Sequence, residues 1–328
     1  MSHFPVISSN LSTVHLASFL KEKYCFSGNT QCNLLKTGIN HTYLVQSGVE
    51  KFIFRVYSLN WRTEVEILEE IRLLNTLKAQ EISISHPIFD KNKNYIQSIN
   101  APEGERLGLM FSFAKGEKLL NFSEETHFKV GQLMAQIHQI TLQFNLERVQ
   151  YSPQILLIDS LNYIENFLPN DSEEMDFMKK TQQYLIDEFS KIDVNLVRKG
   201  AVHLDIWFDN LNITKDNKIT IFDFDFCGNG LLCMDIAYYI LQLNSTEKDE
   251  AVCQSKIKNF LNGYESITKI TDEEKRIIPM LGVSLYFFYL GIQCQRFDNW
   301  SNTFLNETYL KRFINLLVKR YFELNKLG

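Results

Sequence analysis

The sequence predicts an α+β fold with two lobes, in which a small antiparallel β-sheet with one helix precedes a larger, mainly helical lobe. The chain has 328 residues, which exceeds the usual size of a single hydrophobic core. Short apolar runs separated by turn residues dominate residues 1–115, whereas apolar residues recur mostly at helical spacing in residues 116–328. We place the boundary between the lobes at Ala114-Lys115-Gly116.

The first lobe alternates strand and turn signals around one helix. The helix is predicted over about 63–79, because Thr63-Glu-Val-Glu66 forms a capping box and the apolar residues that follow share one helical face. The remaining apolar and β-branched runs predict three strands between residues 32 and 57 and short strands near 83–88, 95–99 and 107–113.

The second lobe is predicted to be helical apart from one β-hairpin. The hairpin has strands over about 211–214 and 219–222. The stretch Ile277 to Ile292, within the longest uncharged run, is predicted to be too short for a membrane span, so we expect a buried helix there and no membrane partner. Helical periodicity covers residues 123–141, 154–168, 173–191, 234–243, 248–264, 272–296 and 303–326.

Composition is that of an ordinary globular protein, with 45% hydrophobic and 22% charged residues. Residues 1–115 hold 12 Lys and Arg against 10 Asp and Glu, and residues 116–328 hold 22 against 29, which gives +2 and −7. This balance argues against a nucleic-acid partner. It suits nucleotide phosphates in the first lobe and a neutral or cationic acceptor in the second, although an ordinary solvated surface explains it equally well.

The six cysteines show no CxxC spacing and no metal-ligand spacing with the histidines, and the N-terminus does not resemble a signal peptide. We therefore expect a cytoplasmic protein. Both a monomer and a homodimer fit the sequence.

The strongest chemical signal is His203-Leu-Asp-Ile-Trp-Phe-Asp-Asn210, followed after the hairpin by Ile221-Phe-Asp-Phe-Asp225. In kinases this pattern places an aspartate at the attacking hydroxyl and two oxygen ligands on Mg²⁺. Asp205, with His203 beside it, is the candidate catalytic group, and Asn210 and Asp223 are the candidate metal ligands. A surface hairpin would explain these residues singly, but hardly all of them together.

The predicted register of the hairpin supports the metal site. If the turn is centred between Asp216 and Asn217, residues whose numbers sum to 433 lie opposite each other, and Asn210 faces Asp223. Opposed residues of an antiparallel pair lie about 4.5 to 5.5 Å apart at Cα, close enough for two side-chain oxygens to share a small cation.

The first lobe offers a cation for nucleotide phosphates. Arg55 lies in an otherwise apolar strand, and Glu70 falls within the apolar arc of the helix, where a carboxylate needs a partner. We therefore expect an Arg55–Glu70 ion pair that holds phosphates, with a purely structural buried pair as the alternative. The turn containing Gly38 and Asn40 is a weaker candidate for covering the nucleotide.

Several motifs together resemble one known group. They are Gly38-Ile-Asn40, Phe54-Arg-Val-Tyr57, Glu70-Ile-Arg-Leu-Leu74, Leu133-Met-Ala-Gln-Ile-His138, His203 to Asn210, Phe222-Asp-Phe-Asp-Phe226 and Asp235-Ile-Ala237. Over about residues 33–265 the chain resembles the aminoglycoside phosphotransferase and choline kinase superfamily, and it is most similar to the branch of type II homoserine kinases and bacterial stress-response kinases.

This resemblance implies a bilobal protein-kinase-like fold that transfers the γ-phosphoryl group of ATP to a hydroxyl with the help of Mg²⁺. It also implies that His203 and Asp235 support the catalytic loop. The hinge under the adenine would be formed by Met110, Phe111 and Phe113. Two residues depart from the family pattern, since Leu204 replaces a glycine and Arg55 replaces the lysine of the aminoglycoside enzymes.

The leading hypothesis is an ATP-dependent kinase acting on the hydroxyl of a small molecule, such as an amino alcohol, a homoserine-like compound, an aminoglycoside or a sugar. A bacterial protein Ser/Thr kinase and a nucleotide-binding regulatory module without turnover are the alternatives. Asp225 is expected either to assist a second metal or acceptor site or to serve as a turn carboxylate. Candidate acceptor residues, which are equally compatible with a core role, are Tyr264, Tyr286, Tyr289, Asp298 and Trp300.

Overall fold

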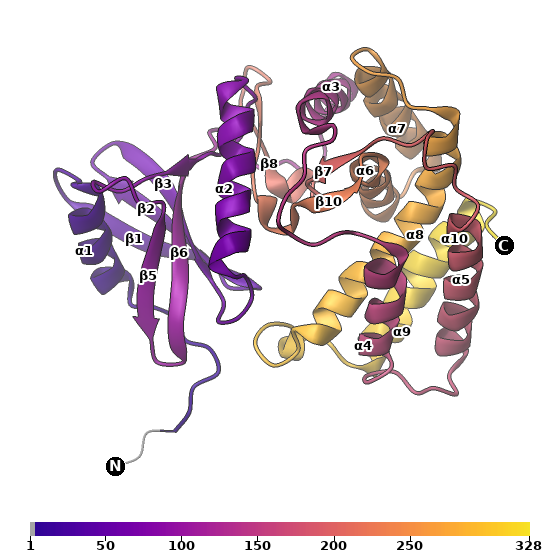
Figure 1. Ribbon diagram of the computed structural model, residues 1–328, viewed down its shortest axis with the longest axis horizontal. Helices are drawn as coiled ribbons and strands as arrows, with labels where there is room; N and C mark the ends of the chain where they lie inside the picture. The colour runs from indigo at the N-terminus through magenta and orange to yellow at the C-terminus, as the bar shows by residue number, and fades with distance from the viewer. Residues whose placement is uncertain (1–3) are drawn as a thin grey trace. The chain divides into compact units, whose positions relative to one another are not determined.

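The computed structural model describes residues 4–328, and the chain forms two units (Figure 1). The first unit holds the residues up to Lys115 together with the short segment Asp298–Asn302. The second unit holds Gly116–Phe297 and Thr303–Gly328. The first is built on an antiparallel sheet and the second on helices, so the predicted α+β class is confirmed.

The sheet of the first unit has the order β1-β2-β3-β6-β4, with β5 paired to β6, and all its pairs are antiparallel. Alternation along β3 places Phe54 and Val56 in one apolar core and Arg55 on the opposite face. The strands are β1 (Thr30–Lys36), β2 (Asn40–Ser47), β3 (Glu50–Tyr57), β4 (Pro87–Ile88), β5 (Ile96–Ala101) and β6 (Gly104–Ser112).

Two helices cover the sheet. The predicted helix α2 (Glu64–Ala79) starts at Thr63 with both hydrogen bonds of the capping box in place. The helix α1 (Thr13–Tyr24) was not predicted, although its Leu16 and Leu20 pack into the core formed by the strands. Because Arg55 turns away from that core, towards α2, the two helices lie on opposite faces of the sheet (Figure 1).

The second unit is mainly helical, as predicted. The predicted helix over 154–168 begins with a π-helical turn at Gln154–Asp159 before α4 (Ser160–Ile164), and the last predicted helix also contains a π-helical turn, Ile314–Lys319. The other helices are α3 (Glu124–Thr141), α5 (Glu173–Phe189), α6 (Cys233–Thr246), α7 (Glu250–Glu265), α8 (Asp272–Gln295), α9 (Glu307–Phe313) and α10 (Arg320–Leu324).

Two pairs of short strands interrupt these helices. The predicted hairpin is present as β8 (Leu211–Ile213) and β9 (Ile219–Ile221). A second pair, β7 (Lys199–Val202) with β10 (Gly228–Leu231), was not predicted. The segment that carries the kinase pattern lies between β7 and β10, and it contains β8 and β9.

Helices α3 and α7 approach each other through two glycines. A Cβ atom on Gly131 would lie 2.0 Å from the carbonyl oxygen of Phe260, and a Cβ on Gly263 would lie 1.9 Å from that of Phe128. Neither position can therefore carry a side chain without separating the helices. This close packing brings the end of α3, with His138, against Tyr264 of α7.

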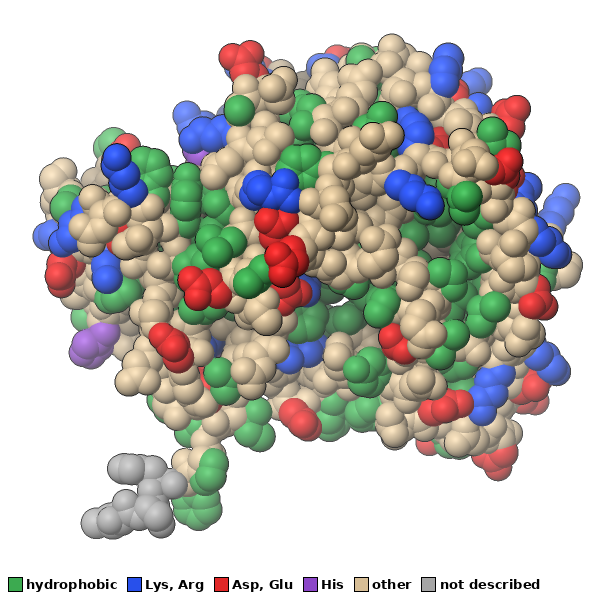
Figure 2. Space-filling model, in the orientation of Figure 1, with side chains coloured by type: hydrophobic (Ala, Val, Ile, Leu, Met, Phe, Trp, Pro, Cys, Tyr) green, Lys and Arg blue, Asp and Glu red, His purple; other side chains and the backbone are tan. Residues whose placement is uncertain are grey.

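The helix α8 is the buried helix that was expected here, but the expectation that this segment is too short to span a membrane was wrong. Within residues 4–328 it is the one helix that is long and apolar enough to cross a membrane, but 78% of its most apolar stretch is buried inside the protein. A buried core helix passes the same test of length and composition. On the face drawn in Figure 2, Lys and Arg side chains are scattered among Asp and Glu side chains.

We expect the stability of the fold to decrease in mild acid because of His127. Its Nδ1 pairs with the Tyr239 hydroxyl at 2.8 Å, and its Nε2 is buried without a hydrogen-bond partner in the described chain. Burial lowers the pKa of His127 from 6.5 to about 4. Between these values the unfolded chain binds a proton that the folded chain excludes, so this group should cost about 1.4 kcal/mol of stability per pH unit as the pH falls.

Urea denaturation at pH 7 and pH 5 tests this expectation. His41, whose pKa burial also lowers to about 4, adds a similar contribution. Burial lowers the pKa of His86 and His203 as well, so His127 accounts for only part of the loss. The His127→Gln variant should therefore lose less stability than the wild type between the two pH values, while a His15→Gln variant, altered at an exposed position, should lose as much as the wild type. A wild-type stability that is independent of pH in this range would contradict the assignment.

Candidate active site

The catalytic segment runs from the end of β7 to the start of β8, and a buried carboxylate in the first turn of α6 holds its beginning. The backbone N–H of His203 donates to Oδ2 of Asp235 at 2.9 Å, and the backbone N–H of Leu204 donates to Oδ1 at 2.6 Å. Asp235 therefore supports the loop, as the sequence resemblance implied. Its position at the helix N-terminus also favours a negative charge.

Asp235 has a second support in α3. The ring Nε2 of His138 donates to Asp235 Oδ2 at 3.0 Å, and its Nδ1 accepts from the Tyr264 hydroxyl at 2.7 Å. Burial alone would raise the pKa of the Asp235 carboxyl, but the hydrogen bond from His138 and the backbone hydrogen bond from His203 hold that pKa below its usual value. The loop is thus anchored to an ionised carboxylate in the core.

His203 has a structural role in this geometry. Its Nδ1 accepts from the backbone N–H of Asp205 at 3.1 Å, and its Nε2 donates to the carbonyl of Phe222 at 3.2 Å. Burial lowers the pKa of the imidazole, which favours the neutral ring required by this pair of bonds. His203 therefore connects the backbone of Asp205 to the residue that precedes Asp223.

Leu204 adopts a left-handed backbone conformation, with φ of 65°, and its side chain is fully buried. Such a conformation costs a leucine about 1–3 kcal/mol, so neighbouring groups must hold it. Its N–H is held by Asp235, and its carbonyl accepts a hydrogen bond from the Tyr289 hydroxyl at 2.6 Å. The glycine usual in the family would adopt the same conformation without strain.

Both carboxylate oxygens of Asp205 receive hydrogen bonds. Asn210 Nδ2 donates to Oδ2 at 2.7 Å and also to the backbone carbonyl of Asp205 at 2.9 Å. The Tyr238 hydroxyl donates to Oδ1 at 2.5 Å. The side chain is half-buried and therefore remains partly accessible from outside the protein.

The register of the hairpin differs from the prediction by one residue. Leu211 pairs with Ile221, so opposed numbers sum to 432, and Asn210 lies opposite Phe222 rather than Asp223. The loop is one residue longer than predicted, because Asn217 takes a left-handed conformation after a turn closed by its N–H to the carbonyl of Thr214. The predicted pairing was therefore wrong.

Asp223 follows directly on the paired residues and has a left-handed backbone of its own, with φ of 66°. Asn210 Nδ2 donates to two oxygens of Asp205, which fixes the orientation of the amide. The amide oxygen Oδ1 is then available to a metal ion, because no described residue donates a hydrogen bond to it. An amide oxygen and a carboxylate that follow paired strands fit Mg²⁺, which usually binds one or two protein oxygens together with phosphates and water. Residues 4–328 contain no group of three or more His, Cys, Asp or Glu side chains that could hold a metal ion by themselves.

Asp225 follows the hairpin and lies outside its strands. It lies in a 3₁₀ turn, Phe224–Phe226, where its side chain is buried and its backbone carbonyl accepts from Arg148 at 2.5 Å. This position agrees with the prediction of a turn carboxylate, which was one of the two alternatives for Asp225.

In the first unit the predicted ion pair is confirmed. Arg55 Nη1 lies 2.8 Å from Glu70 Oε1, and the two side chains are 8% and 0% exposed. The Tyr57 hydroxyl donates to Glu70 Oε2 at 3.0 Å, and the guanidinium lies 4.7 Å from the centre of the Phe111 ring. Tyr57 was not singled out from the sequence, although it stands two residues after Arg55 on the same strand face.

The other predicted nucleotide contacts lie at the ends of strands. Gly38 is in the turn before β2, and Asn40 begins β2 and accepts from the backbone N–H of Ser58 at 3.4 Å. Trp300 belongs to the first unit, and its Nε1 lies 3.6 Å from the place where a Cβ on Gly38 would stand. Trp300 therefore does not belong to the helical unit, which was expected to bind the acceptor.

The residues predicted to form the hinge lie at the end of β6 and directly after it. The Met110 side chain is fully buried in the core beneath the sheet, so only its backbone is available to a ligand. Phe111 is also buried, on the face that carries Arg55, and Phe113 follows the strand and is half-buried.

The remaining acceptor candidates are separated by the structure. Tyr264 and Tyr286 are buried core residues, bonded to His138 and to the Ser245 hydroxyl at 2.6 Å, whereas Tyr289 supports the catalytic loop. Asp298 belongs to the first unit.

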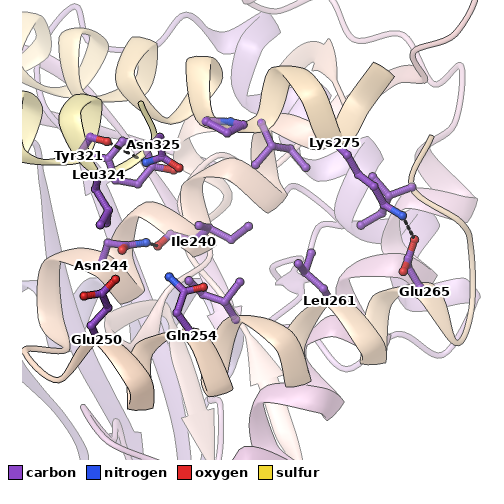
Figure 3. Close-up of a pocket in the computed structure, with 14 residues that line it drawn as sticks. Ile240, Asn244, Glu250, Gln254, Leu261, Glu265, Lys275, Tyr321, Leu324 and Asn325 are labelled. Carbon is purple, nitrogen blue, oxygen red and sulfur yellow. Dashed lines mark hydrogen bonds and ion pairs between the residues drawn. The ribbon is translucent and has the colours of Figure 1, made fainter. Parts of the chain in front are cut away.

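A cavity of about 360 Å³ lies between α6, α7, α8 and α10 (Figure 3). A Lys275–Glu265 ion pair of 2.9 Å closes one end, and Glu250 lies near the other. None of the predicted site residues lines this cavity, which is therefore separate from the catalytic loop.

Three features together define the class of kinase-fold phosphotransferases. They are an aspartate held through both oxygens by a loop asparagine and a helix tyrosine, a hairpin flanked by Asn210 and Asp223, and a sheet with a buried Arg–Glu pair. The sequence profile of the phosphotransferase enzyme family matches residues 33–268. The chain belongs to this family, and it is a kinase.

Individual relatives span nearly the whole chain. An uncharacterized protein, sll1119, of Synechocystis is 27% identical over 94% of this chain and 85% of its own length, and a homoserine kinase of Agrobacterium fabrum is 23% identical over 86% and 85%. A microcompartment-associated aminopropanol kinase structure has a TM-score of 0.77 at 18% identity, covering 96% of this chain and 99% of its own. Amicoumacin kinase hAmiN, in complex with AMP-PNP, Ca²⁺ and Ami, has the same TM-score at 19% identity, covering 96% and 97%.

Proposed function

We propose that this kinase transfers the γ-phosphoryl group of ATP to the hydroxyl of a small amino alcohol or hydroxy amino acid, with Asp205 as the base. The observation that carries the proposal is the Asp205 carboxylate, which is fixed by Asn210 and Tyr238 at the start of the hairpin that ends in Asp223. The family profile supports phosphoryl transfer, and relatives named as homoserine kinase and aminopropanol kinase favour this class of acceptor.

The proposed chemistry needs placement and charge more than covalent participation. Asp205 orients the acceptor hydroxyl and accepts its proton as the oxygen attacks the γ-phosphorus. Arg55, held by Glu70, binds phosphate oxygens through its planar fork. Mg²⁺ held by Asn210 and Asp223 would neutralise charge on the transferring phosphoryl group.

A small acceptor is favoured over a protein substrate. After the hairpin the chain passes through a 3₁₀ turn and a short strand directly into α6, without a long activation segment. The proposed location is the cytoplasm, where ATP is available, and the six cysteines are all free, which suits a reducing compartment.

A phosphoacceptor screen tests the proposal. Purified protein is incubated with Mg·ATP and, separately, with aminopropanol, choline, homoserine, an aminoglycoside, a hexose and a generic protein substrate. We expect ADP release and a phosphorylated product with an amino alcohol or homoserine. Phosphorylation of the protein substrate alone would support the Ser/Thr kinase alternative, and nucleotide binding without product would support the regulatory module.

The metal assignment predicts a selective loss of Mg²⁺-dependent nucleotide binding. Asp223→Ala removes a proposed ligand, whereas Asp216→Ala removes an exposed carboxylate at the tip of the same hairpin. Titration of ATP with and without Mg²⁺ should show that only Asp223→Ala abolishes the gain in affinity due to the metal. Equal Mg²⁺ dependence in both variants would exclude Asp223 as a ligand.

A further inference from the structure

Two tyrosines of the helical unit hold consecutive residues of the catalytic loop. Tyr238 on α6 donates to Asp205 Oδ1 at 2.5 Å, and Tyr289 on α8 donates to the carbonyl of Leu204 at 2.6 Å. Their rings pack together, with centroids 5.1 Å apart and an interplanar angle of 40°. We call Tyr238 and Tyr289 the tyrosine pair.

Helical spacing explains how α6 reaches two parts of the loop. Asp235 and Tyr238 are three residues apart, so they lie on the same face of α6. Asp235 binds the backbone of the loop, and Tyr238 binds the side chain of the base. A single helix face therefore fixes both the path of the chain and the orientation of the carboxylate.

Tyr238 is a permanent donor at this position. Its side chain is only 3% exposed, and its ring is held by Tyr289, which itself packs against Phe226 and Phe288. Burial, together with the negative charge of Asp205, raises the pKa of the Tyr238 hydroxyl well above its usual value. The phenol therefore keeps its proton and cannot swing out of the core without breaking the aromatic packing.

The two donors on Asp205 act from different elements. Asn210 occupies Oδ2 from within the loop, and Tyr238 occupies Oδ1 from α6. A carboxylate bonded through both oxygens cannot rotate about its Cβ–Cγ bond without losing one of these bonds. The phenol also occupies Oδ1, so a water molecule cannot donate to that oxygen from the same side.

We propose that Tyr238 is a positioning residue that couples ATP consumption to phosphorylation of the acceptor, by fixing Asp205 for the acceptor hydroxyl and keeping water from Oδ1. The inference rests on the proposed role of Asp205 as the base. In transfer, the acceptor O–H bond breaks, its proton passes to Asp205, the acceptor oxygen bonds to the γ-phosphorus, and ADP leaves with the electrons of the broken P–O bond. If water takes the place of the acceptor, the same steps release inorganic phosphate and ADP.

The test compares Tyr238→Phe with Tyr239→Phe. Tyr239 is the next residue on α6, is 2% exposed, and donates or accepts one hydrogen bond with His127 at 2.8 Å, away from the base. Each variant therefore removes one buried phenol hydroxyl and keeps its ring. Phosphorylated acceptor and inorganic phosphate are measured separately with Mg·ATP, with and without acceptor, and the melting temperature is measured for each protein.

Tyr238→Phe should lower kcat for transfer by roughly tenfold to a hundredfold, as expected for a misplaced catalytic group, with KM for ATP unchanged. It should also increase several-fold the phosphate released per acceptor phosphorylated. Tyr239→Phe should leave both quantities at wild-type values. A role in packing alone would lower the melting temperature without changing this ratio.

Each result decides the inference. Equal kcat and equal coupling in the two variants would overturn it, as would a loss of transfer with no increase in the ratio of hydrolysis to transfer. If the wild-type protein phosphorylates no acceptor, the proposed function fails, and ATP hydrolysis without acceptor still separates the variants. Faster hydrolysis in Tyr238→Phe than in Tyr239→Phe would then support the exclusion of water, and equal hydrolysis would refute it.

Discussion

Asp205→Asn should lower the turnover of phosphoryl transfer by about 10²-fold to 10⁴-fold, the usual contribution of a general base. The amide keeps the shape of the side chain, and it can accept from Asn210 through its oxygen while donating to the Tyr238 hydroxyl. The loop should therefore stay in place, and affinity for Mg·ATP should change little. Steady-state kinetics with the acceptor found in the screen, and calorimetric titration of the nucleotide, measure the two quantities.

Asp209→Asn provides the matched control. Asp209 lies in the same loop, but its carboxylate forms a 2.8 Å ion pair with Lys118 at the surface. This variant should retain turnover within a few-fold of the wild type. If Asp205→Asn did the same, the assignment of the base would be wrong.

The Arg55–Glu70 pair is expected to give the largest effect on stability. Arg55→Ala leaves Glu70 fully buried beside Tyr57 without its cation, a change that costs about 3–5 kcal/mol for broken buried pairs. It should also weaken ATP binding, because the proposed phosphate ligand is gone. Arg55→Lys should retain part of the activity, since a point charge replaces a bidentate fork.

A double-mutant cycle separates the contact from the individual residues. Adding Glu70→Ala to Arg55→Ala should recover part of the lost free energy of unfolding but none of the activity. The exposed pair between Arg72 and Glu69, 2.7 Å apart on the same helix, is the control. Its removal by Arg72→Ala should cost at most about 1 kcal/mol. Strict additivity of the Arg55 and Glu70 changes in urea denaturation would show that the pair is not energetically coupled.

The ion pair could be predicted from sequence because two independent signals converged on it. Helical periodicity placed Glu70 within the apolar arc of α2, and a buried carboxylate requires a partner. The register of the hairpin could not be predicted in the same way. It depends on the left-handed conformation of Asn217, and a two-residue turn was an equally reasonable choice from the residue types.

The unpredicted elements depend on contacts between distant segments. β7 and β10 pair residues that are about thirty positions apart, and neither strand is long enough to be distinctive alone. Tyr238 could not be assigned from its sequence neighbours, because its spacing from Asp235 becomes meaningful only when the path of the catalytic loop is known. Sequence patterns therefore predicted candidates for the reacting groups, while the structure was needed to identify the groups that hold them.

The left-handed backbone of Leu204 has a consequence for how the enzyme matures. This conformation is unfavourable for a leucine, so the shape of the loop depends on its hydrogen bonds to the first turn of α6 and the middle of α8. Residues of α8 follow the loop by about eighty positions in the chain. A nascent or partly folded chain that already contains the hairpin would therefore lack an aligned base. Catalytic competence should appear late, together with completion of the helical core.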